Sequence, residues 1–208
     1  DVHVIEPFRI PDHWRRYRAI DYGLDMLACL WCAVDEMGNA YIYREVCGKD
    51  LIISDACKAI LTAEAAGERP ICTFAPKDIW ERSRITGIAR AEAFGEGGVP
   101  LSPVANGRED GWLNLKEWLK LRPDGTGGMA PRLLIFSNCK ELIRCIPLLQ
   151  HDDKKPTDVS TEPHDITHAP DALRYMLDGR PGPTQIMIPR EGGRPLEDQV
   201  ADFMRYGG

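Results

Sequence analysis

The chain has 208 residues, of which 43% are hydrophobic and 28% are charged, and its formal net charge is −6. This composition is too apolar for a disordered chain, and no apolar run approaches the roughly 20 residues that span a bilayer, so we expect no membrane protein. The negative charge argues against binding nucleic acid by bulk electrostatics, so action on phosphates would require cations to bridge them to carboxylates.

The cysteines and the start of the chain indicate its compartment. Seven cysteines, an odd number, are scattered through apolar segments, which argues against a disulfide framework and for a reducing cytoplasm. Cys29 and Cys32 have the spacing of half a zinc motif, but they lack a second pair and favour an interpretation as buried thiols. No secretion signal opens the chain, and its start at Asp1 is expected for a piece of a longer protein.

Alternating polarity predicts an antiparallel meander of three strands at residues 18–23, 27–34 and 40–46. The period then changes, and apolar residues at helical spacing from Leu51 to Ala63, with Gly67 as a stop, predict a helix that crosses the sheet. Residues 70–75 form a short apolar run between turn residues, which is typical of a buried parallel strand.

Strands and helices alternate in the next part of the chain. We expect helices at 88–94, 112–119 and 139–149, strands at 99–104 and 132–137, an exposed loop at 150–162 and a last helix whose apolar side runs from Ala169 to Leu177. The pattern predicts an α/β fold with a mixed sheet flanked by helices. Three regions follow: a lead-in at 1–17, a domain at 18–178 and a C-terminal tail at 179–208.

Three aspartates fall where this topology brings chemistry together, at strand ends and a helix start. Asp21 lies inside an apolar strand, where a carboxylate is costly unless it is paired or holds a metal, although an Asp near a turn is common. Asp78 follows the strand at 70–75 and could instead cap a turn. Asp171 could be present for its favourable charge near a helix N-terminus, but His168 is three residues away on the same helix face.

Several catalytic motifs are missing from the sequence. It contains no GxxxxGK[ST] loop, so we expect no binding or hydrolysis of nucleoside triphosphates by this chain. It also contains no GxGxxG fingerprint and no GxSxG elbow, which makes covalent serine chemistry a poor hypothesis.

Taken in order, several segments resemble the nuclease domain of the large terminase subunit of tailed bacteriophages. The most specific is His168-Ala-Pro-Asp-Ala-Leu-Arg-Tyr175 near the C-terminal end. The other segments that carry the resemblance are residues 7–11, 19–23, 33–38, 41–45, 75–80, 111–112, 134–139 and 142–147.

The resemblance implies an RNase H-like fold, in which a five-stranded mixed sheet carries three acidic residues that bind two Mg2+ or Mn2+ ions. It assigns the acids to Asp21, Asp78 and Asp171, and His168 matches a histidine beside the metals in some members. Asp21 would bridge both ions, while Asp78 and Asp171 would each hold one. His168, as a neutral imidazole near neutral pH, could orient water or shuttle a proton.

The sequence departs from the family pattern at some positions. Many relatives have an acidic residue directly before the motif histidine, where this chain has Thr167, and Asp165 could take over that role. The second acid is the least secure transfer, because its surroundings vary in the family. Glu45 and Asp110 are the alternatives, although Glu45 could be a buried salt-bridge partner for Arg174.

The resemblance also implies a function and partners. The chain would be an endonuclease that cuts concatemeric double-stranded viral DNA in the host cytoplasm, with little sequence preference. Its partners would be an ATPase domain missing from this chain, the portal protein and the small terminase subunit. Two alternatives remain: an RNase H-like resolvase, integrase-type nuclease or ribonuclease, and a non-catalytic module that docks DNA or portal protein.

Overall fold

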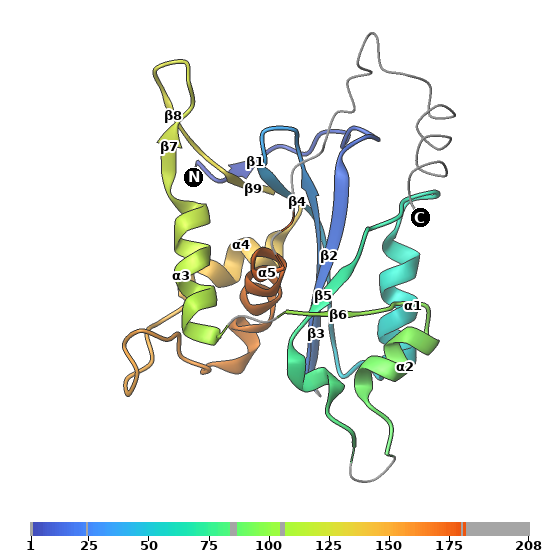
Figure 1. The fold of residues 1–208 in the computed structure, drawn as a ribbon. Coiled ribbons are helices and arrows are strands. Elements are labelled where there is room, and N and C mark those ends of the chain that lie inside the picture. Colours follow the sequence, from blue (N-terminus) through green and yellow to red (C-terminus); the bar gives the residue numbers. More distant parts are fainter. Residues whose placement is uncertain (1, 24, 84–86, 105–106, 180, 182–208) are drawn as a thin grey trace, which may run out of the picture.

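The computed structural model describes residues 2–23, 25–83, 87–104, 107–179 and 181. Its centre is a seven-stranded sheet in the order β1-β9-β4-β3-β2-β5-β6, with helices on both faces (Figure 1). The strands of this sheet are β1 (Val4–Ile5), β2 (Arg15–Tyr22), β3 (Met26–Val34), β4 (Ala40–Lys49), β5 (Thr73–Ala75), β6 (Ser102–Pro103) and β9 (Leu133–Phe136).

The antiparallel meander and the parallel strands that follow it are confirmed. Strand β3 pairs antiparallel with β2 and with β4, while β5 runs parallel to β2 and β9 runs parallel to β4. The described sheet has two strands more than the five that the resemblance implied, and short strands, β1 and β6, form its two edges. Strand β1 lies within the expected lead-in at 1–17 and pairs with β9.

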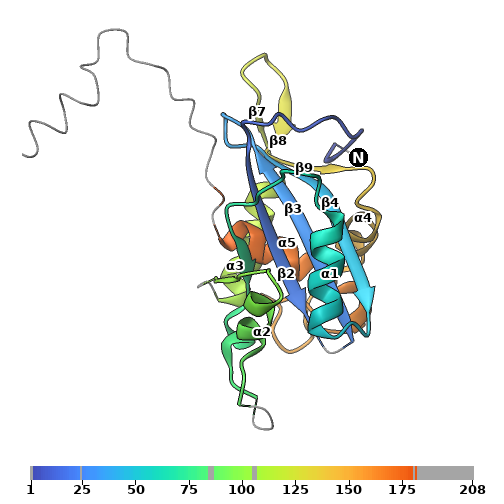
Figure 2. The same cartoon turned by 90° about the vertical axis from the view of Figure 1, so that its right-hand side faces the viewer.

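Helices cover the sheet on both faces (Figure 2). Helix α5 (His168–Asp178) packs on β2 and β3 and also contacts α3 (Arg108–Leu119) and α4 (Lys140–Cys145). The opposite face carries α1 (Ile53–Ala63) and α2 (Arg90–Glu96). Strand β3 lies between both layers, and all nine of its residues are buried, as expected for a strand that is covered on both faces.

The sequence predicted most elements but misplaced several boundaries. The helix expected at 139–149 ends at Cys145 and continues as a 3₁₀ turn, η2 (Ile146–Leu148), because Pro147 has no N–H to continue the α-helical ladder. Helix α3 begins at Arg108, earlier than expected. The sequence analysis also missed a hairpin of β7 (Leu121–Pro123) and β8 (Met129–Pro131).

Other expectations concern the cysteines and the tail. All seven cysteines are free thiols, five buried and two half-buried. In the tail expected at 179–208, only Gly179 and Pro181 lie among the described residues. No helix in the described ranges is long and apolar enough to cross a membrane.

Candidate active site

Strand β2 and helix α5 bring Asp21 and His168 together. Side chains alternate along β2, so Arg18 points to the α1 side, where it pairs with Glu64, and Asp21 points to the α5 side. His168 is the first residue of α5, and its Nδ1 lies 2.7 Å from Oδ2 of Asp21. The side chains are 4% and 17% exposed for His168 and Asp21, respectively, so this hydrogen bond is largely shielded from water.

Burial and neighbouring charges shift the pKa values of this pair. Burial raises the pKa of Asp21, the hydrogen bond from His168 opposes this rise, and the negative charge of Asp171 adds to it. Burial alone would lower the pKa of His168, but its contact with Asp21 outweighs that effect, so the net shift is upward. His168 therefore binds a proton more tightly than an ordinary histidine does, whereas the sequence analysis expected a neutral imidazole.

Asp171 lies in the first turn of α5, as predicted, and two arginines contact its carboxylate. Oδ1 accepts hydrogen bonds from Nε and Nη2 of Arg174 at 3.0 and 2.8 Å. Nη1 of Arg108 lies 3.2 and 3.3 Å from the two oxygens, while Nε of Arg108 donates to Asp158. The Asp171 and Arg174 side chains are only 8% and 4% exposed, so the two guanidinium groups compensate a charge that water cannot reach well.

Asp78 lies in η1 (Lys77–Trp80), directly after β5, as the strand-end argument predicted. Its side chain is 59% exposed and accepts a hydrogen bond of 2.9 Å from Arg90. Burial raises the pKa of Tyr175, and the negative charges of Asp21, Asp171 and Asp78 contribute further to the rise. All three predicted acids therefore act electrostatically on Tyr175, although they come from three separate elements.

The three acids do not form one compact ligand cluster. Within the described ranges, one group of histidine, cysteine and acidic side chains has all its ligand atoms within 4.8 Å of one another, and it consists of Asp25, His164 and His168. Asp25 lies between β2 and β3, and His164 lies in η3 (His164–Ile166) just before α5. Sequence analysis missed both residues; the only available signal was that His164 precedes the motif histidine by four positions.

The glycines of two sequence segments, Gly23 in 19–23 and Gly111 in 111–112, lie where other side chains approach the backbone closely. A Cβ at Gly23 would lie 2.7 Å from Oδ1 of Asp25 and 3.0 Å from Cε1 of His168. A Cβ at Gly111 would lie 2.6 Å from Asp178 and 2.8 Å from the Arg174 side chain. A side chain at either position would push α5 or its neighbours away, so both glycines let α5 pack closely.

The alternative acids lie apart from the candidate site. Glu45 accepts hydrogen bonds from the backbone N–H groups of Glu141 and Leu142 at 2.7 and 3.0 Å, at the start of α4, and the described residues show no ion pair between Glu45 and Arg174. Asp110 is exposed in the first turn of α3. Asp165 is 56% exposed in η3 and lies 3.9 Å from Arg144.

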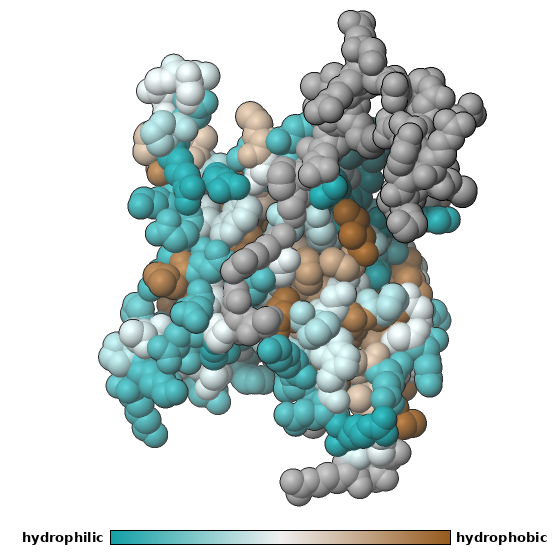
Figure 3. Space-filling view, viewed as in Figure 1, coloured by the Kyte–Doolittle hydropathy of each residue, from teal (hydrophilic) through white to brown (hydrophobic). Residues whose placement is uncertain are grey.

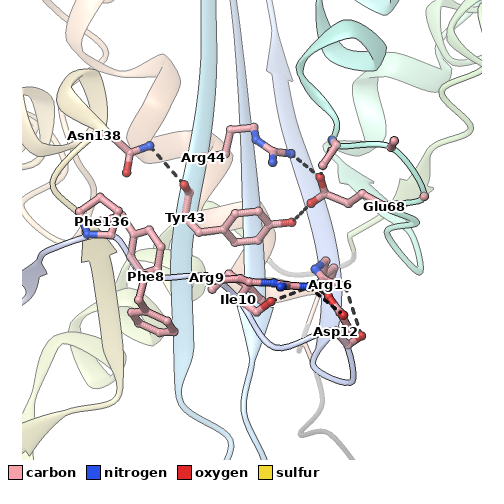
Figure 4. A pocket seen from close by; sticks show the side chains of 14 residues that line it. Phe8, Arg9, Ile10, Asp12, Arg16, Tyr43, Arg44, Glu68, Phe136 and Asn138 are labelled. Atoms are coloured by element: carbon pink, nitrogen blue, oxygen red, sulfur yellow. Dashed lines mark hydrogen bonds and ion pairs between the residues drawn. The ribbon is translucent and has the colours of Figure 1, made fainter.

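A large hollow in the described part of the chain does not coincide with these acids. It has a volume of about 920 Å³ and lies beside Tyr43, Arg44 and Glu68, where Glu68 accepts hydrogen bonds from both of the other side chains (Figure 4). Arg16 lines it near the start of β2, whereas Asp21 lies near the other end of that strand. In the view of Figure 3, hydrophilic side chains predominate on α3 and along the lower rim of the molecule.

Comparisons with known proteins support the fold. No protein-family model matches the sequence, and no curated protein matches it significantly. Among solved structures, the P22 large terminase nuclease domain aligns with a TM-score of 0.66 and 19% identity, covering 86% of this chain and 88% of that one.

Two further solved structures have the same fold. The large terminase nuclease domain of bacteriophage SPP1, solved with bound Mn, aligns with a TM-score of 0.55 and 17% identity, covering 85% of this chain and 96% of that one. The large terminase nuclease of thermophilic phage G20c gives a TM-score of 0.51 and 13% identity, covering 84% and 92%. The chain therefore has the RNase H-like fold of large terminase nuclease domains, as the sequence predicted.

Proposed function

We propose that this chain is a divalent-metal-dependent DNA endonuclease. The observation that carries the proposal is the position of three acids in an RNase H-like fold: Asp21 on the interior strand β2, Asp78 after β5 and Asp171 in the first turn of α5. Strand ends and helix starts meet here, which is where open α/β sheets place their sites.

The donor groups fit a hard divalent ion. Carboxylate oxygens are the ligands that Mg2+ and Mn2+ prefer. Desolvation raises the pKa of the half-buried Asp21, and the negative charge of Asp171 raises it further, an electrostatic repulsion that a dication would relieve. Asp21, Asp78 and Asp171 would hold two ions, which when bound would activate water and stabilise the leaving oxygen of a phosphodiester.

The side chains around the acids have supporting roles. Nδ1 of His168 lies 2.7 Å from Oδ2 of Asp21, and this contact fixes the orientation of that carboxylate. Arg174 orients the Asp171 carboxylate through two hydrogen bonds, and a metal ligand needs such a fixed orientation. Arg108 is 29% exposed beside Asp171 and is placed to contact a phosphate.

We further propose that the chain serves as the nuclease domain of a phage packaging terminase. It would cut concatemeric double-stranded viral DNA in the host cytoplasm, beside a separate ATPase domain, the portal protein and the small terminase subunit. The support is the structural likeness to the P22 and SPP1 nuclease domains, and the Mn bound to the latter favours manganese or magnesium here.

Cleavage of supercoiled plasmid tests the endonuclease proposal. We expect nicked and linear products with Mn2+ or Mg2+ and none with EDTA, and no DNA-stimulated ATP turnover. Cleavage that survives chelation would contradict the metal mechanism. Linear duplex, a four-way junction and an RNA–DNA hybrid assayed side by side separate a terminase nuclease from a resolvase or ribonuclease, while a non-catalytic docking module would show neither cleavage nor stabilisation by divalent ions.

A further inference from the structure

Beside the proposed acidic site, three side chains from two distant parts of the chain converge on one point. His164 Nδ1 lies 2.8 Å from Oδ2 of Asp25, His168 Nε2 lies 3.3 Å from the same oxygen, and the two nitrogens lie 3.2 Å apart. Asp25 and His164 are 53% and 54% exposed, so the point is open to solvent, while His168 is buried.

Hydrogen bonds cannot join all three pairs of atoms in this triangle at once. If His168 is neutral with its proton on Nδ1, facing Asp21, then the lone pair of Nε2 faces the lone pairs of Asp25. His168 can instead carry protons on both nitrogens. In that case, if His164 Nδ1 also carries a proton and donates it to Asp25, the N–H groups of the two histidines repel each other. If that His164 nitrogen carries no proton, its lone pair faces Asp25 instead, so every arrangement leaves one repulsive contact.

A metal ion can contact all three atoms at once, because each can offer it a lone pair. Donor atoms bound to one tetrahedral zinc ion, at bond lengths of about 2.0 to 2.1 Å, are about 3.3 to 3.4 Å apart. The three separations of 2.8, 3.3 and 3.2 Å nearly match one face of such a tetrahedron. The exposed side of the cluster leaves the fourth position to water.

The other nitrogen of His168 adds independent support. Metal-bound histidines commonly donate their second N–H to a carboxylate, which fixes the tautomer and the ring orientation. His168 Nδ1 lies 2.7 Å from the half-buried Asp21 carboxylate, as such a second contact requires. Gly23 contributes as well, because a side chain there would approach both Asp25 and His168.

We propose that Asp25, His164 and His168 bind one zinc-type transition-metal ion, at a site separate from the one we assign to Mg2+ or Mn2+. Two imidazoles and one carboxylate favour Zn2+, Co2+ or Ni2+ over Mg2+, which prefers oxygen ligands. Because His168 contacts both this site and Asp21, an ion here fixes the orientation of Asp21. The site thus couples a transition metal to the proposed nuclease centre.

The test is a Zn2+ titration of metal-stripped protein by calorimetry, with excess Mg2+ present throughout to occupy oxygen sites. We expect one Zn2+ per chain, and affinity at least about tenfold lower for His164→Ala and for Asp25→Asn, since even outer-shell substitutions cause such losses. His151→Ala, which removes another exposed histidine, should bind like the parent. Melting temperatures verify that each variant is folded.

Co2+ supplies a spectroscopic signature, because a mixed nitrogen and oxygen site gives visible absorption that His164→Ala should lose. The proposal is overturned if the parent binds no Zn2+ in Mg2+, or if His164→Ala binds it as tightly as the parent. Asp78→Asn separates this proposal from the nuclease proposal: it should retain Zn2+ binding whether or not the parent cleaves DNA. A parent that binds Zn2+ and never cleaves would contradict the nuclease alone.

Discussion

Glu45 is an acid that we expect to stabilise the fold rather than to bind metal. Its two carboxylate oxygens accept hydrogen bonds from the N–H groups of Glu141 and Leu142, in the first turn of α4. These donors have no partner within the helix, and the side chain of the N-cap residue Cys139 does not cap it. Glu45 therefore caps α4 from the neighbouring strand, with its negative charge at the favourable end of the helix.

Glu45→Ala removes both hydrogen bonds. Loss of a helix cap costs about 0.5 to 2 kcal/mol, and a hydrogen bond to a charged group contributes about 1.5 to 3 kcal/mol. Because Glu45 is half-buried, we expect a total loss of about 2 to 4 kcal/mol. For a chain of this size that corresponds to a melting temperature lower by about 4 to 16 °C.

Glu45→Gln should lose less stability than Glu45→Ala, because the amide keeps one acceptor oxygen. In addition, burial raises the pKa of Glu45 and so already disfavours its charged form. The matched control is Glu141→Gln, which removes a carboxylate from a partly exposed pair with Arg144 and should cost about 0 to 1 kcal/mol. Differential scanning fluorimetry with and without Mn2+ measures all three. If Glu45→Gln melts like the parent and loses stabilisation by Mn2+, Glu45 is a ligand and this reasoning is wrong.

The remaining predictions concern the candidate site. The raised pKa of Asp21 favours folding at low pH, and this contribution is lost as pH rises above 3.8 through the folded pKa. The melting temperature of Asp21→Asn should therefore rise relative to that of the parent from acidic to neutral pH. A difference that stays constant with pH would contradict this. Asp171→Asn should abolish plasmid cleavage and Asp165→Asn should retain it at high Mn2+, and the reverse result would move the third ligand to η3. His168→Ala should cleave at a reduced rate in the same assay, while a rate equal to the parent's would remove it from the site. Gly111→Ala should destabilise the fold by about 1 to 3 kcal/mol through overpacking of α3 against α5, and an unchanged denaturation midpoint would show that the helices separate freely.

The sequence predicted the meander and the parallel strands, because each rests on local periodicity and on a topology with few alternatives. The three-residue spacing in the last helix put His168 and Asp171 on one face, while only the family resemblance placed His168 beside the acids. The edge strand β1 was missed since two residues carry no period, and β7 and β8 were missed for the same reason.

Charge partners could not be predicted from the sequence. Arg108 and Arg174 lie in helices whose apolar spacing says nothing about which acids they contact, and their pairing with Asp171 depends on how α3 packs on α5. Asp25 is separated from His164 by 139 positions. Only the position of the turn between β2 and β3 beside the start of α5 brings these two residues together.

Crystals soaked with Mn2+ and measured for anomalous scattering test the central claim most directly. We predict Mn2+ peaks within bonding distance of the carboxylates of Asp21, Asp78 and Asp171, with Arg108 shifted from its contact with Asp171. If crystals soaked to saturation show no manganese peak at these carboxylates, or show one only between Asp25 and His164, the proposed nuclease centre is contradicted.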